Sequence, residues 1–105
     1  MNKHKNPLEL LAQDPVELSL VSTKSKLMIV ITKLIREKNW TQAQAAKEMG
    51  VSQPRISNLM NGQIGKFSID MLLEMLGKLG YLLDLSFNPE NVNHPIEMNI
   101  KKAAV

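Results

Sequence analysis

Cysteine is absent from this chain of 105 residues, and so are long apolar runs. Without cysteine there is no disulfide and no thiolate-bound metal, and the absence fits a reducing compartment. No stretch reaches the roughly 18 consecutive apolar residues of a membrane-spanning helix. The basic residues 1–5 are followed by Pro7, Glu9 and Asp14, which interrupt the apolar core of any signal peptide. The sequence therefore predicts a cytoplasmic protein of one small domain, without membrane contact.

Arrangements typical of catalysis or metal binding are also lacking. The two histidines, His4 and His94, stand apart from each other and from any carboxylate at a metal-ligand spacing. Gly62 and Gly65 flank a linker and do not form a phosphate-binding loop between a strand and a helix. We therefore expect no catalytic residue, no metal and no cofactor, and we do not expect an enzyme.

Charge is distributed unevenly along the chain, although the net value is only +3. Between Lys24 and Lys66 there are eight basic and two acidic residues, a formal charge of +6, so the rest of the chain sums to −3. A basic segment is typical of a surface that binds phosphates, because neutralising phosphates releases counterions. Lysines on solvated helix faces would give the same pattern, so charge alone does not decide.

Helical spacing of apolar residues predicts a helix between Leu27 and Lys38. Upstream, Asp14 can cap a helix that has Pro15 in its first position, and this segment could join the next one through residues 22–25. The alternation of apolar residues over 16–20 also fits a short strand, so the upstream segment is left open.

The C-terminal part changes from helical to alternating periodicity. Ser68 can cap a helix that runs to Leu79 and stops at Gly80. Alternation predicts a strand over residues 81–87, ended by an Asn-Pro pair, and a second strand over residues 96–100.

Residues 41–61 meet the local demands of a helix-turn-helix, in which two short helices cross around a tight turn. Thr41 and Gln44 form a capping box at the start of the first helix. Gly50 lies at the turn, where a left-handed backbone favours glycine, and Ser52 caps the second helix. The inward positions carry small or apolar side chains, namely Ala45, Ala46, Met49, Val51, Ile56 and Leu59. A generic helical hairpin would rarely satisfy all of these positions together, so the segment predicts a helix-turn-helix.

The outward face of the second helix is polar and carries no carboxylate. Its residues are Gln53, Pro54, Arg55, Ser57, Asn58 and Asn61. The amides Gln53 and Asn58 can pair with adenine, Arg55 can bind guanine or phosphate, and Pro54 can contact a thymine methyl group. We expect phosphate contacts from the start of the first helix and from surface lysines, namely Gln42, Lys47 and Lys66. The sequence therefore predicts sequence-specific DNA binding.

The segment 41–62, TQAQAAKEMGVSQPRISNLMNG, resembles the helix-turn-helix of the XRE/Cro family of phage repressors. Residues 66–80 resemble the branch that contains HigA-type antitoxins, and the similarity covers about residues 24–87. The resemblance implies an all-α core of five helices in a lambda-repressor-like domain, a dimer, and an inverted-repeat operator often near the protein's own promoter. The family positions that face DNA correspond here to Ser52, Gln53, Arg55 and Asn58, while that of Gln42 approaches a phosphate. Residues 88–105 extend beyond the usual end of the family's strand.

A homodimer is also expected because one helix-turn-helix buries too little surface for strong specificity. The C-terminal strand over residues 81–87 supplies the expected interface, with Tyr81, Leu83, Leu85 and Phe87. Pairing with the same strand of a second subunit would satisfy its free backbone groups symmetrically, and we favour this arrangement. The alternative is a hairpin within the chain between residues 81–87 and 96–100, which leaves one edge free for a dimer.

The chain divides into an N-terminal arm (1–23), a DNA-binding domain (24–80) and a C-terminal strand and tail (81–105). The acidic and apolar stretch 8–21 could wrap a basic partner such as a RelE-like toxin, or it could pack on its own core. The sequence predicts a DNA-binding transcriptional regulator that is the antitoxin and autorepressor of a HigBA-type toxin-antitoxin pair. The alternative is a stand-alone phage-type repressor without a toxin partner.

Overall fold

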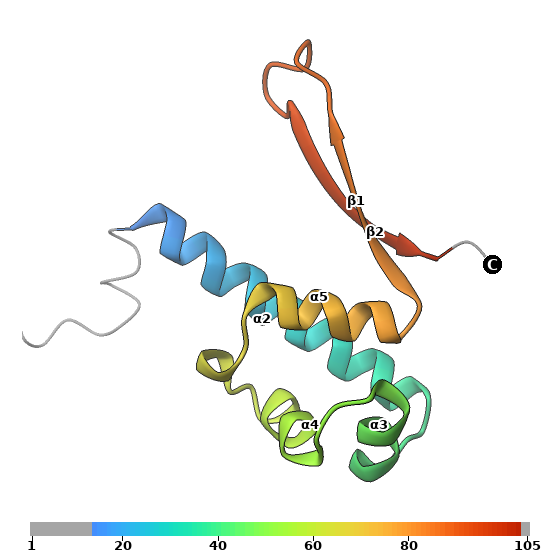
Figure 1. Cartoon of the computed structure of the whole chain (residues 1–105). Coiled ribbons are helices and arrows are strands. Elements are labelled where there is room, and N and C mark those ends of the chain that lie inside the picture. The colour runs from blue at the N-terminus through green and yellow to red at the C-terminus, as the bar shows by residue number, and fades with distance from the viewer. Residues whose placement is uncertain (1–13, 104–105) are drawn as a thin grey trace, which may run out of the picture.

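A computed structural model describes residues 14–103 of the chain. Its elements are, in chain order, α2 (Pro15–Glu37), α3 (Gln42–Met49), α4 (Gln53–Met60), the 3₁₀ helix η1 (Ile64–Lys66), α5 (Ile69–Lys78), β1 (Tyr81–Phe87) and β2 (Ile96–Lys102). The α-helices form a body from which the two strands project as a hairpin (Figure 1). No helix among the described residues is long and apolar enough to cross a membrane.

The described residues contain four α-helices, where the resemblance to phage repressors implied five. Between α4 and α5 only a 3₁₀ turn forms, because Gly62 leaves α4 with a φ of +69° and Phe67 is already extended. After α5 the chain continues as strands. The architecture is therefore a mostly helical domain with a C-terminal antiparallel hairpin.

The helix α2 is continuous through the segment that the sequence left open between helix and strand. Its cap is Asp14, whose carboxylate accepts the backbone N–H of Val16 at 3.0 Å and of Glu17 at 3.2 Å. Pro15 takes the first helical position, where no hydrogen bond from its nitrogen is needed. The two predicted helical segments are thus one helix, and the boundary expected at residue 23 falls inside it.

The expected N-terminal arm is described only in part. Residues 1–13, with the first half of the acidic and apolar stretch, lie outside the described residues. The described remainder begins α2, and residues 14–20 are exposed; the first core residue of α2 is Leu27.

The core lies where the four helices meet. Along α2, Leu27, Met28, Ile31 and Ile35 are buried at the helical spacing read from the sequence. The helix α5 packs along α2, and α3 packs against α4. The buried side chains that α3, α4, α5 and the preceding segment add are Ala45, Ala46, Met49, Ile56, Leu59, Phe67, Leu72, Met75 and Leu76. This core fixes the inner side of α4 and leaves its outer side free.

The helix α5 begins and ends as predicted from its flanking residues. The Ser68 hydroxyl accepts the backbone N–H of Met71 at 3.3 Å. Its hydrogen bond to the Asp70 carboxylate is the main reason why the pKa of Asp70 lies below the usual value. Gly80, with a φ of +93°, then turns the chain from α5 into β1.

The strands β1 and β2 pair with each other in antiparallel register, from Tyr81 opposite Lys102 to Phe87 opposite Ile96. The first strand has the predicted bounds, and the second extends past the predicted residue 100. We had favoured pairing of β1 with a second subunit. At the edge of β1 that faces β2 this prediction is wrong, because the hairpin within the chain forms there. The strands are joined by the short loop 88–95, so local pairing has a small loop-closure cost.

Candidate DNA-binding surface

Two reciprocal hydrogen bonds fix the start of α3. The Thr41 hydroxyl accepts the Gln44 N–H at 3.1 Å, and the Gln44 side-chain oxygen accepts the Thr41 N–H at 2.8 Å. This is the predicted capping box. Within residues 14–103 the backbone N–H groups of Gln42 and Ala43 find no acceptor, and no acidic residue lies in this first turn. The positive end of the α3 dipole is therefore free to receive a phosphate.

The turn between α3 and α4 has the left-handed backbone expected at Gly50, with φ of +65° and ψ of 34°. The next residue, Val51, donates its N–H to the carbonyl oxygen of Ala46 at 3.0 Å and packs against the core. Ala45 and Ala46 are buried, and small side chains at these positions let the two helices approach closely. The turn predicted from the sequence is confirmed.

The helix α4 starts at Ser52, whose hydroxyl accepts the Arg55 N–H at 3.2 Å. Its inner side is held by Ile56 and Leu59, which are 0% and 1% exposed. The remaining residues share an outer face at helical spacing, namely Gln53, Pro54, Ser57, Asn58 and Asn61. The structure therefore brings five of the predicted contacts onto one surface.

Arg55 differs from the other predicted contacts of α4. At 100° per residue it lies on the flank of the outer face, on the side of Leu59, and its side chain is half-buried. Gln53 and Pro54 are exposed, whereas Ser57 and Asn58 are half-buried. Arg55 therefore lies at the side of the outer face and not at its centre.

Gln42 is the predicted phosphate contact that the structure brings beside α4. Its side-chain amide donates to the Met60 sulfur at 3.8 Å, which joins the start of α3 to the end of α4. Lys47 lies on the outer side of α3 and Lys66 ends η1. Both lysines are exposed, and neither belongs to α4.

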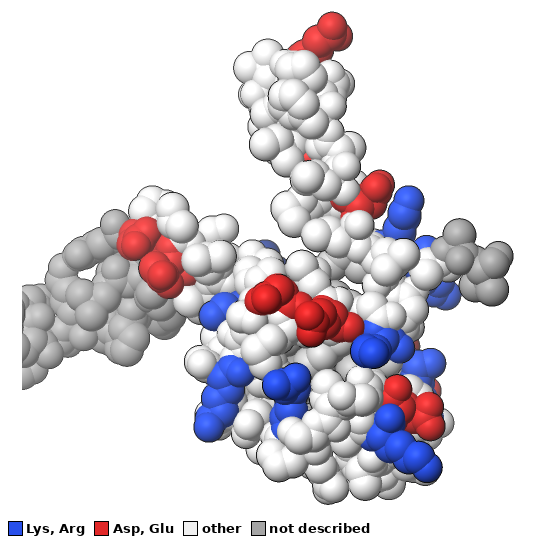
Figure 2. Space-filling view, viewed as in Figure 1, with Lys and Arg blue, Asp and Glu red and all other residues white. Residues whose placement is uncertain are grey.

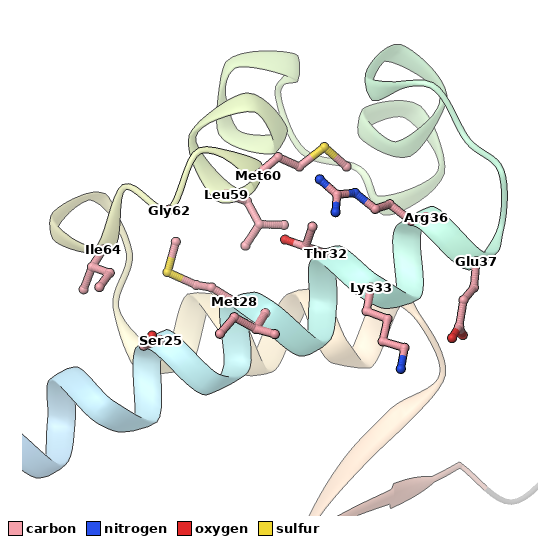
Figure 3. Close-up of a pocket in the computed structure, with 11 residues that line it drawn as sticks. Ser25, Met28, Thr32, Lys33, Arg36, Glu37, Leu59, Met60, Gly62 and Ile64 are labelled. Carbon is pink, nitrogen blue, oxygen red and sulfur yellow. The ribbon is translucent and has the colours of Figure 1, made fainter.

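A groove beside α4 adds a cation that sequence reasoning did not single out. It lies between α2, α4 and η1, has a volume of about 640 Å³, and is lined by Met28, Leu59 and Met60 among others. Figure 3 shows Arg36 reaching from α2 into the space beside Met60. Arg36 was counted in the basic segment, but its neighbours depend on how α2 crosses α4, which spacing along the chain does not reveal.

Basic and acidic side chains lie side by side on the face that Figure 2 shows. Basic side chains are spread over the helical body, and acidic ones lie over α5, at the start of α2 and along the hairpin. The one ion pair among the described residues joins Lys101 and Asp84, 3.8 Å apart on the hairpin. Within residues 14–103, Arg36, Lys47 and Arg55 therefore have no carboxylate partner and keep their charge available for phosphates.

Residues 12–88 match the model of a protein family described as a helix-turn-helix domain. The match spans the four α-helices of the described residues and β1, and it ends before β2. No curated protein matches the chain.

Proposed function

Because the chain belongs to the helix-turn-helix domain family, we propose that it is a transcriptional repressor that reads a specific DNA site with α4. Membership of this family implies DNA binding and a role in regulating transcription. The observation that carries the proposal is the outer face of α4, which is polar, free of carboxylates and held rigid from behind by Ile56 and Leu59.

In this proposal α4 enters the major groove and its residues have separate roles. Gln53 and Asn58 each pair with an adenine through two hydrogen bonds, and Pro54 contacts a thymine methyl group. Ser57 and Asn61 add polar contacts further along the helix, and Ser52 lies at its start. The flank position of Arg55 suits a phosphate better than a base. These residues determine which DNA sequence is bound.

The proposed phosphate contacts lie around α4. The start of α3 offers the free N–H groups of Gln42 and Ala43, and the Gln42 side chain lies against the end of α4. Lys47 and Lys66 add charge at the margin. Such contacts set the position of the protein on the duplex but do not read bases.

Two kinds of substitution test this division of roles. Gln53→Ala or Asn58→Ala should cost about 1–3 kcal/mol of binding free energy at particular base pairs. Lys47→Ala should instead weaken binding to all sequences alike and lower the salt slope by about one. Gel shifts with single base-pair operator variants at several salt concentrations measure both effects, with Ser86→Ala on the hairpin as the control. If Gln53→Ala kept the base preference of the wild type, α4 would not be the reading helix.

We further propose that the repressor is the antitoxin of a HigBA-type pair, represses its own promoter and binds an inverted repeat as a dimer. The resemblance of residues 66–80 to HigA-type antitoxins supports this role. The alternative is a stand-alone phage-type repressor. A small basic toxin encoded beside this chain and neutralised by it would decide for the antitoxin, and a lone gene would decide for the repressor.

The part played by the N-terminal stretch in toxin binding can be tested separately. Among the described residues, deleting residues 1–21 removes the cap Asp14, the exposed first turns of α2 and the half-buried Val21, none of which belongs to the core. We expect the deletion to abolish toxin neutralisation while operator binding persists. Unchanged neutralisation would eliminate this stretch as the toxin contact.

A further inference from the structure

The register of the hairpin gathers apolar side chains from both strands on one face. Leu83 lies opposite Ile100, Leu85 opposite Met98, and Phe87 opposite Ile96. We call these six side chains the hairpin face. The other face carries the pairs Leu82–Lys101, Asp84–Asn99 and Ser86–Glu97, so it is polar except for Leu82. The hairpin is therefore amphipathic.

The helical body does not cover the hairpin face. Its six side chains are between 41% and 67% exposed, and the hairpin projects away from the helices (Figure 1). A two-stranded hairpin alone in water is marginally stable, and a contiguous exposed apolar patch marks a site of interaction. Burying this face against a partner would therefore stabilise the hairpin.

We infer that the hairpin face packs against the same face of a second copy of the chain. The inference rests on the proposed function, because an inverted repeat requires two copies. From their exposed fractions, the six residues offer at most roughly 600 Å² per protomer, compared with the approximately 800 Å² per partner of a standard interface. The face can therefore supply a large part, but not all, of the area of a standard dimer interface.

Charge also favours a second copy over a basic protein. The hairpin face contains no ionised group, and Lys102 lies at its end beside the body. Two such faces can meet without burying a charge. A basic toxin would find no carboxylate on this face, because Asp84 and Glu97 lie on the opposite one.

Packing face to face differs from the edge pairing expected from the sequence. If β1 paired with β1 of the partner, the backbone groups at that edge would be satisfied, but the apolar side chains of both hairpins would stay in water. Packing the faces buries these side chains and leaves the edge groups hydrated, where water satisfies them. Face packing removes the larger penalty.

In this dimer the residues after position 88, where the family match ends, have a role. The match ends at residue 88, and β2 then supplies Ile96, Met98 and Ile100, half of the hairpin face. Without β2 the face would be a single row of side chains on an unpaired strand. The C-terminal extension thus completes the dimer interface.

A pair of adjacent substitutions in the full chain tests the inference. Met98→Glu places a charge on the hairpin face, whereas Asn99→Lys places a charge on the opposite face of the same strand, opposite the Asp84 carboxylate. Neither residue lies on β1, so pairing through the edge of β1 would tolerate both. We expect the wild type and Asn99→Lys to be dimers, and Met98→Glu to dimerise at least about 100-fold more weakly, because it would bury an unpaired charge. Sedimentation equilibrium over a range of concentrations measures the dissociation constants.

Several outcomes would overturn the inference. If the wild type were monomeric at tens of micromolar, the hairpin face would not be an interface between two copies. The same conclusion would hold if the face became covered only when a toxin was added. If Met98→Glu dimerised as tightly as the wild type and Asn99→Lys, the dimer would form through the edge of β1. If Met98→Glu lost its hairpin, Phe87→Glu repeats the comparison on β1, with Ser86→Lys, which lies opposite Glu97, as its control.

The same variant separates the dimer from DNA binding. Met98 lies far along the chain from the helix-turn-helix, so Met98→Glu should keep the helical circular dichroism and the single half-site affinity of the wild type. A wild type that is a dimer but binds no DNA would refute the proposed function and not the dimer interface. A wild type that binds DNA as a monomer would refute the dimer interface and not the proposed function.

Discussion

At the scale of single residues, backbone conformation explains Gly50 better than packing does. Its φ of +65° lies in the left-handed region, yet a Cβ added there would meet no atom within 4 Å. The constraint on this position is therefore torsional strain alone. Gly77 in α5 has equal space around it and no positive φ, so it is a matched control.

Gly50→Ala should lower the free energy of unfolding by about 1 kcal/mol, since the left-handed conformation is strained for alanine. Gly77→Ala should instead raise it by up to about 1 kcal/mol, because alanine is the better helix former. Urea denaturation followed by circular dichroism measures both. If both substitutions changed the free energy of unfolding in the same direction, the positive φ of Gly50 would not be the reason why glycine is needed there.

At the scale of elements, the crossing of α2 over α4 decides which cations of α2 lie near α4. Arg36 lines the groove beside Met60, whereas Lys26, on the same helix, does not line it. Met60 in turn contacts Gln42 at the start of α3. Arg36 thus lies close to a predicted phosphate contact although it comes from outside the helix-turn-helix.

Arg36→Gln should weaken binding to every operator variant alike and lower the salt slope by about one, as expected when one phosphate contact is lost. Lys26→Gln removes the same charge from the same helix and should change the slope less. Titrations of one operator over a range of salt concentrations give both slopes. Equal slopes for the two variants would mean that Arg36 acts through the general field and not through contact.

At the scale of the whole molecule, the hairpin projects from the body that carries the helix-turn-helix. If two chains pack through their hairpin faces, as we propose, we expect the dimer to present two α4 helices to DNA. Such helices suit half-sites about 34–36 Å apart, one turn of the duplex.

Half-site spacing should therefore control the affinity of the wild type. Inserting five base pairs, about half a turn, places the half-sites on opposite sides of the duplex and should reduce binding to that of a single half-site. Met98→Glu, as a monomer, should not respond to the insertion. Gel shifts with the two operators check this, and a wild type that ignored the spacing would bind its half-sites independently.

The sequence alone determined the local features of this protein. Asp14, Thr41, Ser52 and Ser68 were read as caps, and each accepts backbone N–H groups at the start of its helix. The turn at Gly50 and the bounds of β1 were read equally well. Caps, turns and alternation depend on residues a few positions apart, so the chain itself contains the information.

The tertiary structure decided which distant segments meet. The partner of β1, the 3₁₀ turn in place of a further helix, and the nearness of Arg36 to α4 all follow from packing between segments far apart in the sequence. The alternation of Tyr81, Leu83, Leu85 and Phe87 predicted an apolar side of one strand. Only the register with β2 showed that this side is half of a larger face, because register depends on pairing and not on either strand alone.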